Sequence, residues 1–550
     1  MFQFNINPVV NTFQAFYAAE FGAKGIILYS DPADYVIDGE PVYPDGIYLP
    51  GTGTQRGTLY IGSGDPQTPG YPSTDTAYRH PEANLTTLPT IPVYPIGYDD
   101  ASVFLKRMAG NEVIDSWKGN ISGITYRYGP GFAEPDDKKR VAMKIFTHNE
   151  VATAWNVFGI LKGKVEPDRY VIFGNHRDAW GFGAIDPSSG TAAMLEVSKA
   201  FGLVKSKHGW RPRRTIMFAS WGAEEFGLIG SWEWNEEIAK ILNERAVAYL
   251  NIDQIVDGRY VVNAESTPNL KKSIYAAAKK VKDPAPSGDR QTVYDTWKAR
   301  CRDGTNPDGT PVVNTLGSGS DYGPFVQVNG ISAMDFRYIA DYNTSPQGSS
   351  YPTYHSVYDT FYLVDTYYDP GYIYYLAGAQ VMAELARDLA DSLILPLDAS
   401  DYAAAVKGYF EQLRDGDIGQ RMLQEGLSFA GMGSAVDNFT REAEDFHRRL
   451  DEELDLKNVL QVRTYNDQLQ KLERAFIDPL GLPDRPLIRH VVLAPSSKDS
   501  YASEKFPGIV DAMFDIDNNP DPNKWELVKQ QLAVATFIIQ SAASTLMEVA

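Results

Sequence analysis

An alternation of apolar runs and helical patterns between residues 151 and 392 limits the fold of this chain more than any other feature. Strands are expected at "RYVIFGN", "RRTIMFASW" and "AVAYLNID", and helices at "SGTAAMLEVSKAFG" and "EEFGLIGSWEWNEEIAKILNE". Strands that alternate with helices predict a mainly parallel sheet covered by helices on both faces. In such sheets, ligands bind at the carboxyl ends of the strands.

The pattern changes on either side of this region. Before it, short strands such as "GAKGIILYSDPADY" alternate with Gly/Pro loops, and "ASVFLKRMAG" is the one evident helix. After it, apolar residues recur at helical spacing, most clearly in "DPNKWELVKQQLAVATFIIQSAASTLMEVA". We therefore predict an α/β protein with a β-rich domain at 1–150, an α/β domain at 151–392 and a helical domain at 393–550, since 550 residues fit about three domains.

The composition excludes several classes of protein. An apolar fraction of 43% is too high for a disordered chain. The 71 acidic residues exceed the 51 basic residues by 20, which argues against a nucleic acid or an anionic membrane as partner. The single cysteine, Cys301, excludes a disulfide framework and a cysteine-based zinc site.

Polar residues follow each of the three predicted strands. His176 comes directly after the first strand, Glu224 and Glu225 follow the second, and Asp253 ends the third. Taken one at a time, such residues more often cap helices or lie on solvated helix starts. The same holds for Asp186, which follows the first strand in "GNHRDAWGFGAID". His355 lies in a tyrosine-rich loop, "YPTYHSVYDT", where a histidine is more often packed than ligating.

Together these residues predict a pair of zinc ions at the edge of the sheet. Zinc binds imidazole nitrogen and carboxylate oxygen, and two metal ions need a carboxylate between them. A further carboxylate must take a proton from the attacking water. Glu224 and Glu225 suit the roles of base and ligand, because adjacent side chains point in different directions. The alternatives are a structural or receptor domain and, more weakly, a Ser–His–Asp hydrolase, for which no G-x-S-x-G motif follows a strand.

Long blocks of the sequence resemble one known family. They are "GDPQTPGYP", "VEPDRYVIFGNHRD", "GWRPRRTIMFASWGAEEFGLIGS", "LGSGSDY", "YHSVYDT" and "RAFIDPLGLPDRP". In these blocks the chain resembles the glutamate carboxypeptidase II and transferrin receptor family of zinc exopeptidases. The resemblance implies a protease-associated apical domain, a zinc peptidase domain and a helical dimerisation domain that forms a homodimer. It implies hydrolysis of small peptides, with a catalytically silent receptor-like protein as the alternative.

The resemblance also implies a role for each residue of the zinc site. His176 and Asp253 match the ligands of one zinc ion, and Glu225 and His355 match those of the other. Asp186 matches the carboxylate that bridges the two ions.

Further residues match the catalytic and supporting groups of the family. Glu224 matches the general base, and Asp178 is expected to orient His176. A structural calcium site is implied by oxygen ligands from Thr68, Tyr71, Glu233 and Glu236.

The residues that hold a C-terminal glutamate in this family are only partly present. The asparagine position is Thr58 and the lysine position is Ser500, while Tyr354 and Tyr501 persist. We therefore expect an altered specificity.

The neighbouring substrate pocket differs as well. Ser320 and Asp335 replace an asparagine and an arginine, whereas Arg337 remains. An aspartate in place of a cation favours a positively charged group, such as the free α-ammonium of a peptide, so aminopeptidase activity is one form that the altered specificity can take. Alternatively, Asp335 pairs with Arg337 and touches no substrate.

The location of the protein follows less directly from the sequence. Neither a signal peptide nor an apolar run of 18 residues is present. The resemblance implies the extracellular or luminal face of a membrane, and because members of the family begin with an anchor, we expect the N-terminus to be truncated. N-glycosylation sequons, which indicate a secretory route weakly, occur at Asn84, Asn120, Asn343 and Asn438.

Overall fold

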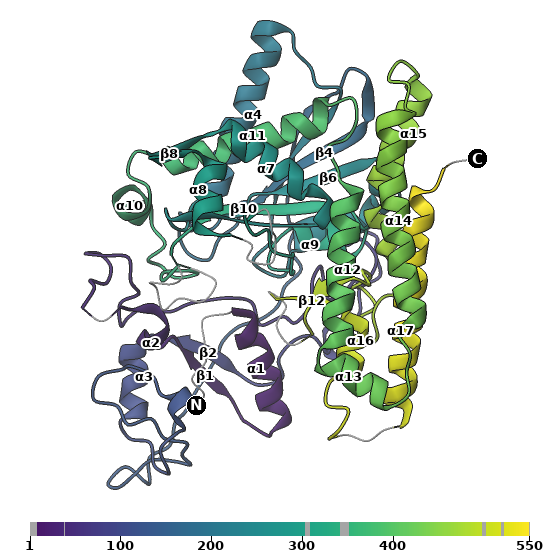
Figure 1. Cartoon of the computed structure of the whole chain (residues 1–550). Coiled ribbons are helices and arrows are strands. Elements are labelled where there is room, and N and C mark those ends of the chain that lie inside the picture. Colours follow the sequence, from purple (N-terminus) through teal and green to yellow (C-terminus); the bar gives the residue numbers. More distant parts are fainter. Residues whose placement is uncertain are drawn as a thin grey trace.

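The computed structural model describes residues 8–37, 39–302, 309–341, 351–497, 502–518 and 522–548. A central sheet with its helices lies above the N-terminal region in Figure 1, and long C-terminal helices run along one side of both. Three of the sequons, at Asn84, Asn120 and Asn438, belong to these ranges, whereas Asn343 lies outside them.

The central sheet has six strands in the order β3-β5-β4-β6-β10-β7. Strands β5, β4, β6 and β10 pair in parallel, and β3 and β7 pair antiparallel at the two edges. This confirms the predicted mainly parallel, mixed sheet. The strands are β3 (Val157–Leu161), β4 (Glu166–His176), β5 (Arg214–Trp221), β6 (Ala246–Asn251), β7 (Val261–Ser266) and β10 (Ala333–Ile339).

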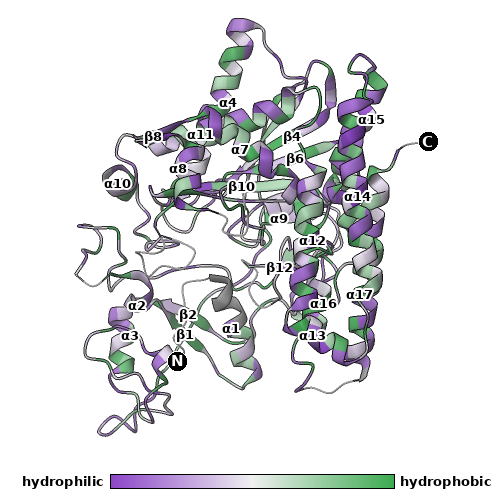
Figure 2. Cartoon of the chain, viewed as in Figure 1, coloured by the Kyte–Doolittle hydropathy of each residue, from purple (hydrophilic) through white to green (hydrophobic). Residues whose placement is uncertain are grey.

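Helices cover both faces of the sheet, as the strand–helix alternation predicted. Successive side chains of a strand point to opposite faces, so Val171 and Phe173 of β4 join one apolar cluster and Ile172 joins another. Helices α4 (Ser188–His208), α7 (Lys271–Lys280) and α11 (Ile373–Asp391) pack on the first face. The second face carries α6 (Ala239–Arg245) and α9 (Tyr322–Gln327). Figure 2 shows apolar residues in the strands of this sheet and along the helices around it.

Smaller elements surround the sheet. They are α5 (Ile229–Glu237), β8 (Lys282–Ser287), β9 (Arg290–Thr292), α8 (Val293–Arg300) and α10 (Phe361–Leu363).

The N-terminal region is loop-rich, but it holds less regular β-structure than expected. Among the described residues before 150, the strands are β1 (Ile26–Tyr29) and β2 (Val93–Ile96), which pair in parallel. Helix α1 (Pro8–Glu20) lies where no helix was expected. The residues through which it packs on β1, Ala15 and Ala18, are small and give only a weak helical pattern. The other helices of this region are α2 (Pro32–Tyr35) and α3 (Tyr98–Leu105).

The C-terminal region is helical, as expected. Helix α14 (Ala430–Glu452) packs between α12 (Ala399–Asp415) and α17 (Pro522–Leu546), and its Phe439 and Phe446 are fully buried. The remaining elements are α13 (Asp417–Gln424), α15 (Val459–Lys471), β11 (Leu493–Pro495), β12 (Ser503–Lys505) and α16 (Pro507–Met513). In the described ranges, every helix is too short or too polar to span a bilayer.

The apolar core does not divide where the predicted domains meet. One continuous cluster of buried side chains runs from Val171 in the sheet to Leu546 in α17. The predicted division at residue 392 falls between α11 and α12, but the sheet and the C-terminal helices share this core. The domain boundaries therefore stay a prediction.

Candidate active site

Three neighbouring strands bring predicted site residues to one edge of the sheet. His176 is the last residue of β4, Glu224 and Glu225 follow the end of β5 at Trp221, and Asp253 follows the end of β6. Strand β4 lies between β5 and β6 and is parallel to both. The carboxyl ends of all three strands therefore meet at the same edge, and their polar side chains converge there.

Asp186 and His355 reach this edge from loops. Asp186 lies just before α4, and His355 has a left-handed backbone conformation with φ of 56°. One carboxylate oxygen of Asp186, Oδ1, is 3.4 Å from Nε2 of His176, and the other, Oδ2, is 3.3 Å from Nε2 of His355. Asp186 thus lies between the two imidazoles.

The predicted ligands form two groups that share Asp186. In the first group, Nε2 of His176 is 3.1 Å from Oδ1 of Asp253. In the second, Nε2 of His355 is 3.2 Å from Oε2 of Glu225. Within each group the ligand atoms lie within 4.8 Å of one another, and Oδ1 of Asp186 is buried without a hydrogen bond. Imidazole nitrogens and carboxylate oxygens at such spacing fit two zinc ions with one shared carboxylate.

Backbone carbonyl groups orient both imidazoles. Nδ1 of His176 is 3.0 Å from the carbonyl oxygen of Asp178, and Nδ1 of His355 is 3.0 Å from that of Arg56. A carbonyl oxygen can only accept, so Nδ1 carries the hydrogen in each ring. In the neutral ring that a metal ion binds, the lone pair is then on Nε2, which points into the cluster.

The electrostatics of the cluster also fit bound cations. Asp186, Glu224, Glu225 and Asp253 are all buried, and burial raises the pKa of Glu224 well above its usual value. Burial alone would lower the pKa of His355, but the carboxylates of Glu225 and Asp186 raise it to about 10. Buried carboxylates that crowd one another need compensating positive charge, which divalent metal ions would supply.

The carboxylate of Asp178 has a different partner from the one expected. It lies 3.9 Å from Nδ1 of His176, so the backbone carbonyl of Asp178, not its side chain, contacts that ring. Its two oxygens instead accept hydrogen bonds from the backbone N–H groups of Glu224 and Glu225, each at 3.1 Å. Asp178 therefore sets the backbone position of the expected base and of the ligand beside it.

Asp359 makes an equivalent contact that the sequence did not reveal. Its two carboxylate oxygens accept from the backbone N–H groups of Ile185 at 2.8 Å and Asp186 at 3.2 Å. The hydroxyl of Tyr351 donates to it at 2.6 Å, and burial raises the pKa of Asp359 to about 7. Asp359 follows His355 by four residues, but no sequence pattern relates it to Asp186, which is 173 positions away.

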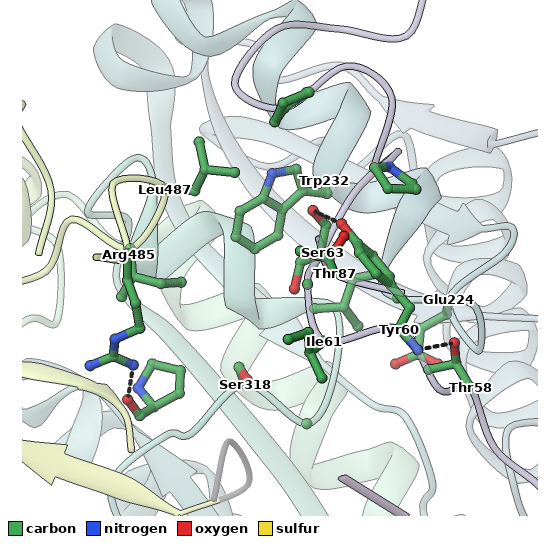
Figure 3. A pocket seen from close by; sticks show the side chains of 18 of the residues that line it. Thr58, Tyr60, Ile61, Ser63, Thr87, Glu224, Trp232, Ser318, Arg485 and Leu487 are labelled. Atoms are coloured by element: carbon green, nitrogen blue, oxygen red, sulfur yellow. Dashed lines mark hydrogen bonds between the residues drawn. The ribbon is translucent and has the colours of Figure 1, made fainter. Parts of the chain in front are cut away.

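A pocket of about 1000 Å³ opens beside the cluster (Figure 3). All six residues expected to bind zinc or act as base line it, together with Tyr354, whose ring stacks on that of His355 at a centroid distance of 3.6 Å. The other walls come from residues 57–87, 227–232, 318–319 and 484–497. Segments from the beginning, the middle and the end of the chain therefore form one pocket.

The other expected substrate residues lie elsewhere. Ser320 and Asp335 are buried behind the cluster and are absent from the described pocket lining, as is Arg337. Ser320 donates to Oδ2 of Asp253 at 2.5 Å, and Asn251 donates to both Ser320 and Asp335. Ser320 therefore supports the metal ligand Asp253 directly, and Asn251 connects Ser320 to Asp335. Tyr501 lies outside the described residues.

The residues expected to bind calcium join the N-terminal region to α5. The carboxylate of Glu233 accepts from the backbone N–H groups of Asp65 at 2.6 Å and Ser73 at 2.7 Å. Thr68 Oγ1 and Glu236 Oε2 are buried without hydrogen bonds. Tyr71 lies in the same loop, with its N–H bonded to the carbonyl of Thr68 and its hydroxyl donating to Tyr78. Two oxygens of this group are thus left available to a cation.

Comparison with known proteins gives consistent matches along the chain. Residues 156–367 match the model of peptidase family M28, and residues 427–547 match the transferrin receptor-like dimerisation domain. Aminopeptidase NAALADL1 of Mus musculus is 39% identical over 549 residues, which cover 98% of this chain and 72% of that protein. Probable glutamate carboxypeptidase LAMP1 of Arabidopsis thaliana is 36% identical over 532 residues, with coverages of 96% and 72%. The glutamate carboxypeptidase 2 homolog of Caenorhabditis elegans is 34% identical over 564 residues, with coverages of 97% and 71%.

Proposed function

Since this chain is a zinc-dependent exopeptidase of the glutamate carboxypeptidase II and transferrin receptor family, within peptidase family M28, we propose that it removes terminal residues from small peptides at the cluster around Asp186. The observation that carries this proposal is the pair of ligand groups that share Asp186. His176 and Asp253 would hold one zinc ion, and Glu225 and His355 the other. Zinc bound there would supply polarisation of the scissile carbonyl group and a more acidic water.

Glu224 is the proposed general base. It belongs to neither ligand group, yet it lines the pocket, and its Oε2 lies 3.9 Å from Nε2 of His176. Burial raises its pKa, so the carboxylate readily takes a proton from the attacking water. Glu224 then gives that proton to the leaving amine nitrogen. Asp178 supports both steps by holding the backbone of Glu224 in place.

We propose that the enzyme acts at a free N-terminus. Among the described lining residues, Arg485 is the one lysine or arginine. Its Nη1 donates to the carbonyl of Pro495 at 2.7 Å and its Nη2 pairs with Asp511, so it is poorly placed to bind a C-terminal carboxylate. Asp484, a lining carboxylate outside the two ligand groups, suits an α-ammonium group better. The relative that is 39% identical is an aminopeptidase, which supports the same choice.

A peptide panel tests this function. Zinc-loaded protein is incubated with dipeptides and tripeptides that differ only in a free or acetylated N-terminus and in a free or amidated C-terminus. We expect cleavage of peptides with a free N-terminus, whether or not the C-terminus is blocked. Cleavage confined to N-acetylated peptides with a C-terminal glutamate would instead assign a carboxypeptidase. Purified protein that binds no zinc and cleaves nothing would favour the receptor-like alternative.

Five finer features complete the proposal. Thr68, Tyr71, Glu233 and Glu236 form a structural calcium site, which the two buried oxygens without hydrogen bonds support. The chain forms a homodimer through its C-terminal helices, as the match to a dimerisation domain suggests. The protein is a glycoprotein, which the sequons support. Its N-terminal region is a protease-associated domain, and it acts at the extracellular or luminal face of a membrane; the family resemblance supports both.

A further inference from the structure

The pocket beside the candidate metal centre has two chemically different sides. One side consists of the imidazoles and carboxylates of the cluster. The other side carries large apolar side chains, several of which are drawn in Figure 3. These are Ile61, Leu85, Leu228, Trp232, Leu487 and Ile488, and we call them the apolar wall.

The apolar wall is held by packing. Leu228 and Trp232 are almost fully buried and form one cluster with Leu487 and Ile488. The indole N–H of Trp232 donates to Oε1 of Glu236 at 3.1 Å, so its polar atom is already paired. The wall thus combines residues from α5 with residues from the segment after α15, and it does not depend on one loop.

Two polar residues near this wall, Tyr60 and Arg485, are bound to protein partners (Figure 3). The hydroxyl of Tyr60 donates to the carbonyl of Ser63, and the N–H of Tyr60 donates to Oγ1 of Thr58, each at 3.2 Å. Arg485 is bound to Pro495 and Asp511. Asp484, an exposed acidic residue, also lines the pocket and would repel a substrate carboxylate.

We infer that the apolar wall is a subsite for a bulky, uncharged side chain of the substrate, such as that of leucine or phenylalanine. This inference rests on the proposed peptidase function, because it assumes that a peptide occupies the pocket. Burial of an apolar side chain against the wall is favourable, whereas a glutamate side chain would lose its hydration without gaining a free lysine or arginine partner among the described lining residues. A volume of about 1000 Å³ also leaves room for a bulky residue beside the scissile bond.

Binding to an inactive enzyme tests the inference without requiring turnover. Zinc-loaded Glu224→Gln protein is titrated calorimetrically with dipeptides in which Ala, Leu, Phe or Glu replaces one residue at a time, at each of the two positions. We expect Leu and Phe to bind about 10- to 100-fold more tightly than Glu at one of the positions. Equal or tighter binding of Glu at both positions would overturn the inference.

A charge placed in the wall tests which residues form the subsite. Two variants, Leu487→Lys and Ile61→Lys, are made separately in the Glu224→Gln background. Each should weaken binding of the Leu dipeptide and strengthen binding of the Glu dipeptide, so that the ratio of the two affinities shifts by at least about tenfold. Leu487→Met, which keeps volume and polarity, should retain the original preference. Thermal midpoints near that of the parent establish that each variant is folded. An unchanged preference in both folded lysine variants would overturn the assignment of the wall.

The outcomes separate this inference from the proposed function. Selective binding of apolar dipeptides by Glu224→Gln protein, with no hydrolysis of any peptide by the wild type, would remove the peptidase proposal and leave the subsite. Hydrolysis by the wild type with no preference for apolar side chains at either position would remove the subsite and leave the peptidase.

Discussion

Nδ1 of His355 lies 3.0 Å from the carbonyl oxygen of Arg56, and the N–H of Arg56 donates in return to the carbonyl oxygen of His355 at 3.0 Å. This pair of contacts joins residues 299 positions apart and attaches the N-terminal region directly to a candidate zinc ligand. The loop that contains Arg56 continues into the pocket lining at Gly57 and Thr58. The N-terminal region is therefore part of the candidate active site, where it sets the orientation of one imidazole.

His355→Ala should reduce the bound zinc from two ions to one per chain. It removes a nitrogen ligand from the group with Glu225 and leaves the group of His176, Asp186 and Asp253 complete. Atomic absorption of the purified protein measures the change. His208→Ala, at the exposed end of α4, is the matched control and should keep two ions. Two tightly bound zinc ions in the His355 variant would contradict the assignment.

Glu224→Gln should keep both zinc ions and lose about 10²- to 10⁴-fold in kcat, because an amide cannot take and return a proton. The side chain keeps its size and lies outside both ligand groups. Zinc content and turnover of a good peptide substrate are measured on the same preparation. Glu237→Gln, at an exposed position of α5, should leave both unchanged. Undiminished turnover in the Glu224 variant would exclude it as the base.

Asp359→Asn should weaken zinc binding by about 10- to 100-fold. An amide in place of the carboxylate turns an NH₂ group toward the N–H of Ile185 or Asp186 and loses one of the two hydrogen bonds that hold the shared ligand. Competition with a chromogenic chelator measures the affinity. Tyr351→Phe removes only the hydroxyl bond to Asp359 and should have a smaller effect. Equal zinc affinity in wild type and Asp359→Asn would show that Asp359 does not position Asp186.

Calcium should raise the thermal midpoint of the wild type and leave that of Glu233→Gln unchanged. Burial raises the pKa of Glu233 to about 8 and that of Glu236 to about 7, so a divalent cation bound between them would stabilise their charged forms. Differential scanning fluorimetry with calcium or a calcium chelator, in zinc-saturated protein, measures the response. Magnesium is the control, since the site is expected to prefer the larger ion. A calcium response that persists in Glu233→Gln would place the ion elsewhere.

Asp398→Asn should lower the thermal midpoint at pH 7, and its effect should fade below about pH 4. Burial alone would raise the pKa of Asp398, but hydrogen bonds from His447, Lys272 and the N–H of Asp401 hold it well below its usual range. A carboxyl group whose pKa is lower in the folded state stabilises the protein above its unfolded pKa, and this contribution disappears as the pH falls. Asparagine still caps α12, so the difference reports the charge. A difference between the midpoints that stays constant from pH 7 to pH 3 would contradict this account.

Most of the sheet could be predicted because its signal is local. The strands around His176, Trp221 and Asn251 are continuous apolar runs, which is what burial on both faces requires. Helix α1 was missed because the residues by which it packs, Ala15 and Ala18, are small. The region before residue 150 was expected to be β-rich, but its loops are held by scattered hydrogen bonds rather than by strand pairing, and these leave no periodic pattern.

The sequence by itself determined which side chains could bind two metal ions. Parallel strands end at one edge of a sheet, so His176, Glu225 and Asp253 had to converge once the strands were recognised. Only the tertiary structure decided what holds and surrounds them. Asp178 and Asp359 position the ligands through backbone amides, and Asp335 lies behind the cluster instead of in the pocket. The reason is physical: these contacts and the apolar wall join segments tens to hundreds of residues apart, and no local periodicity encodes such pairs.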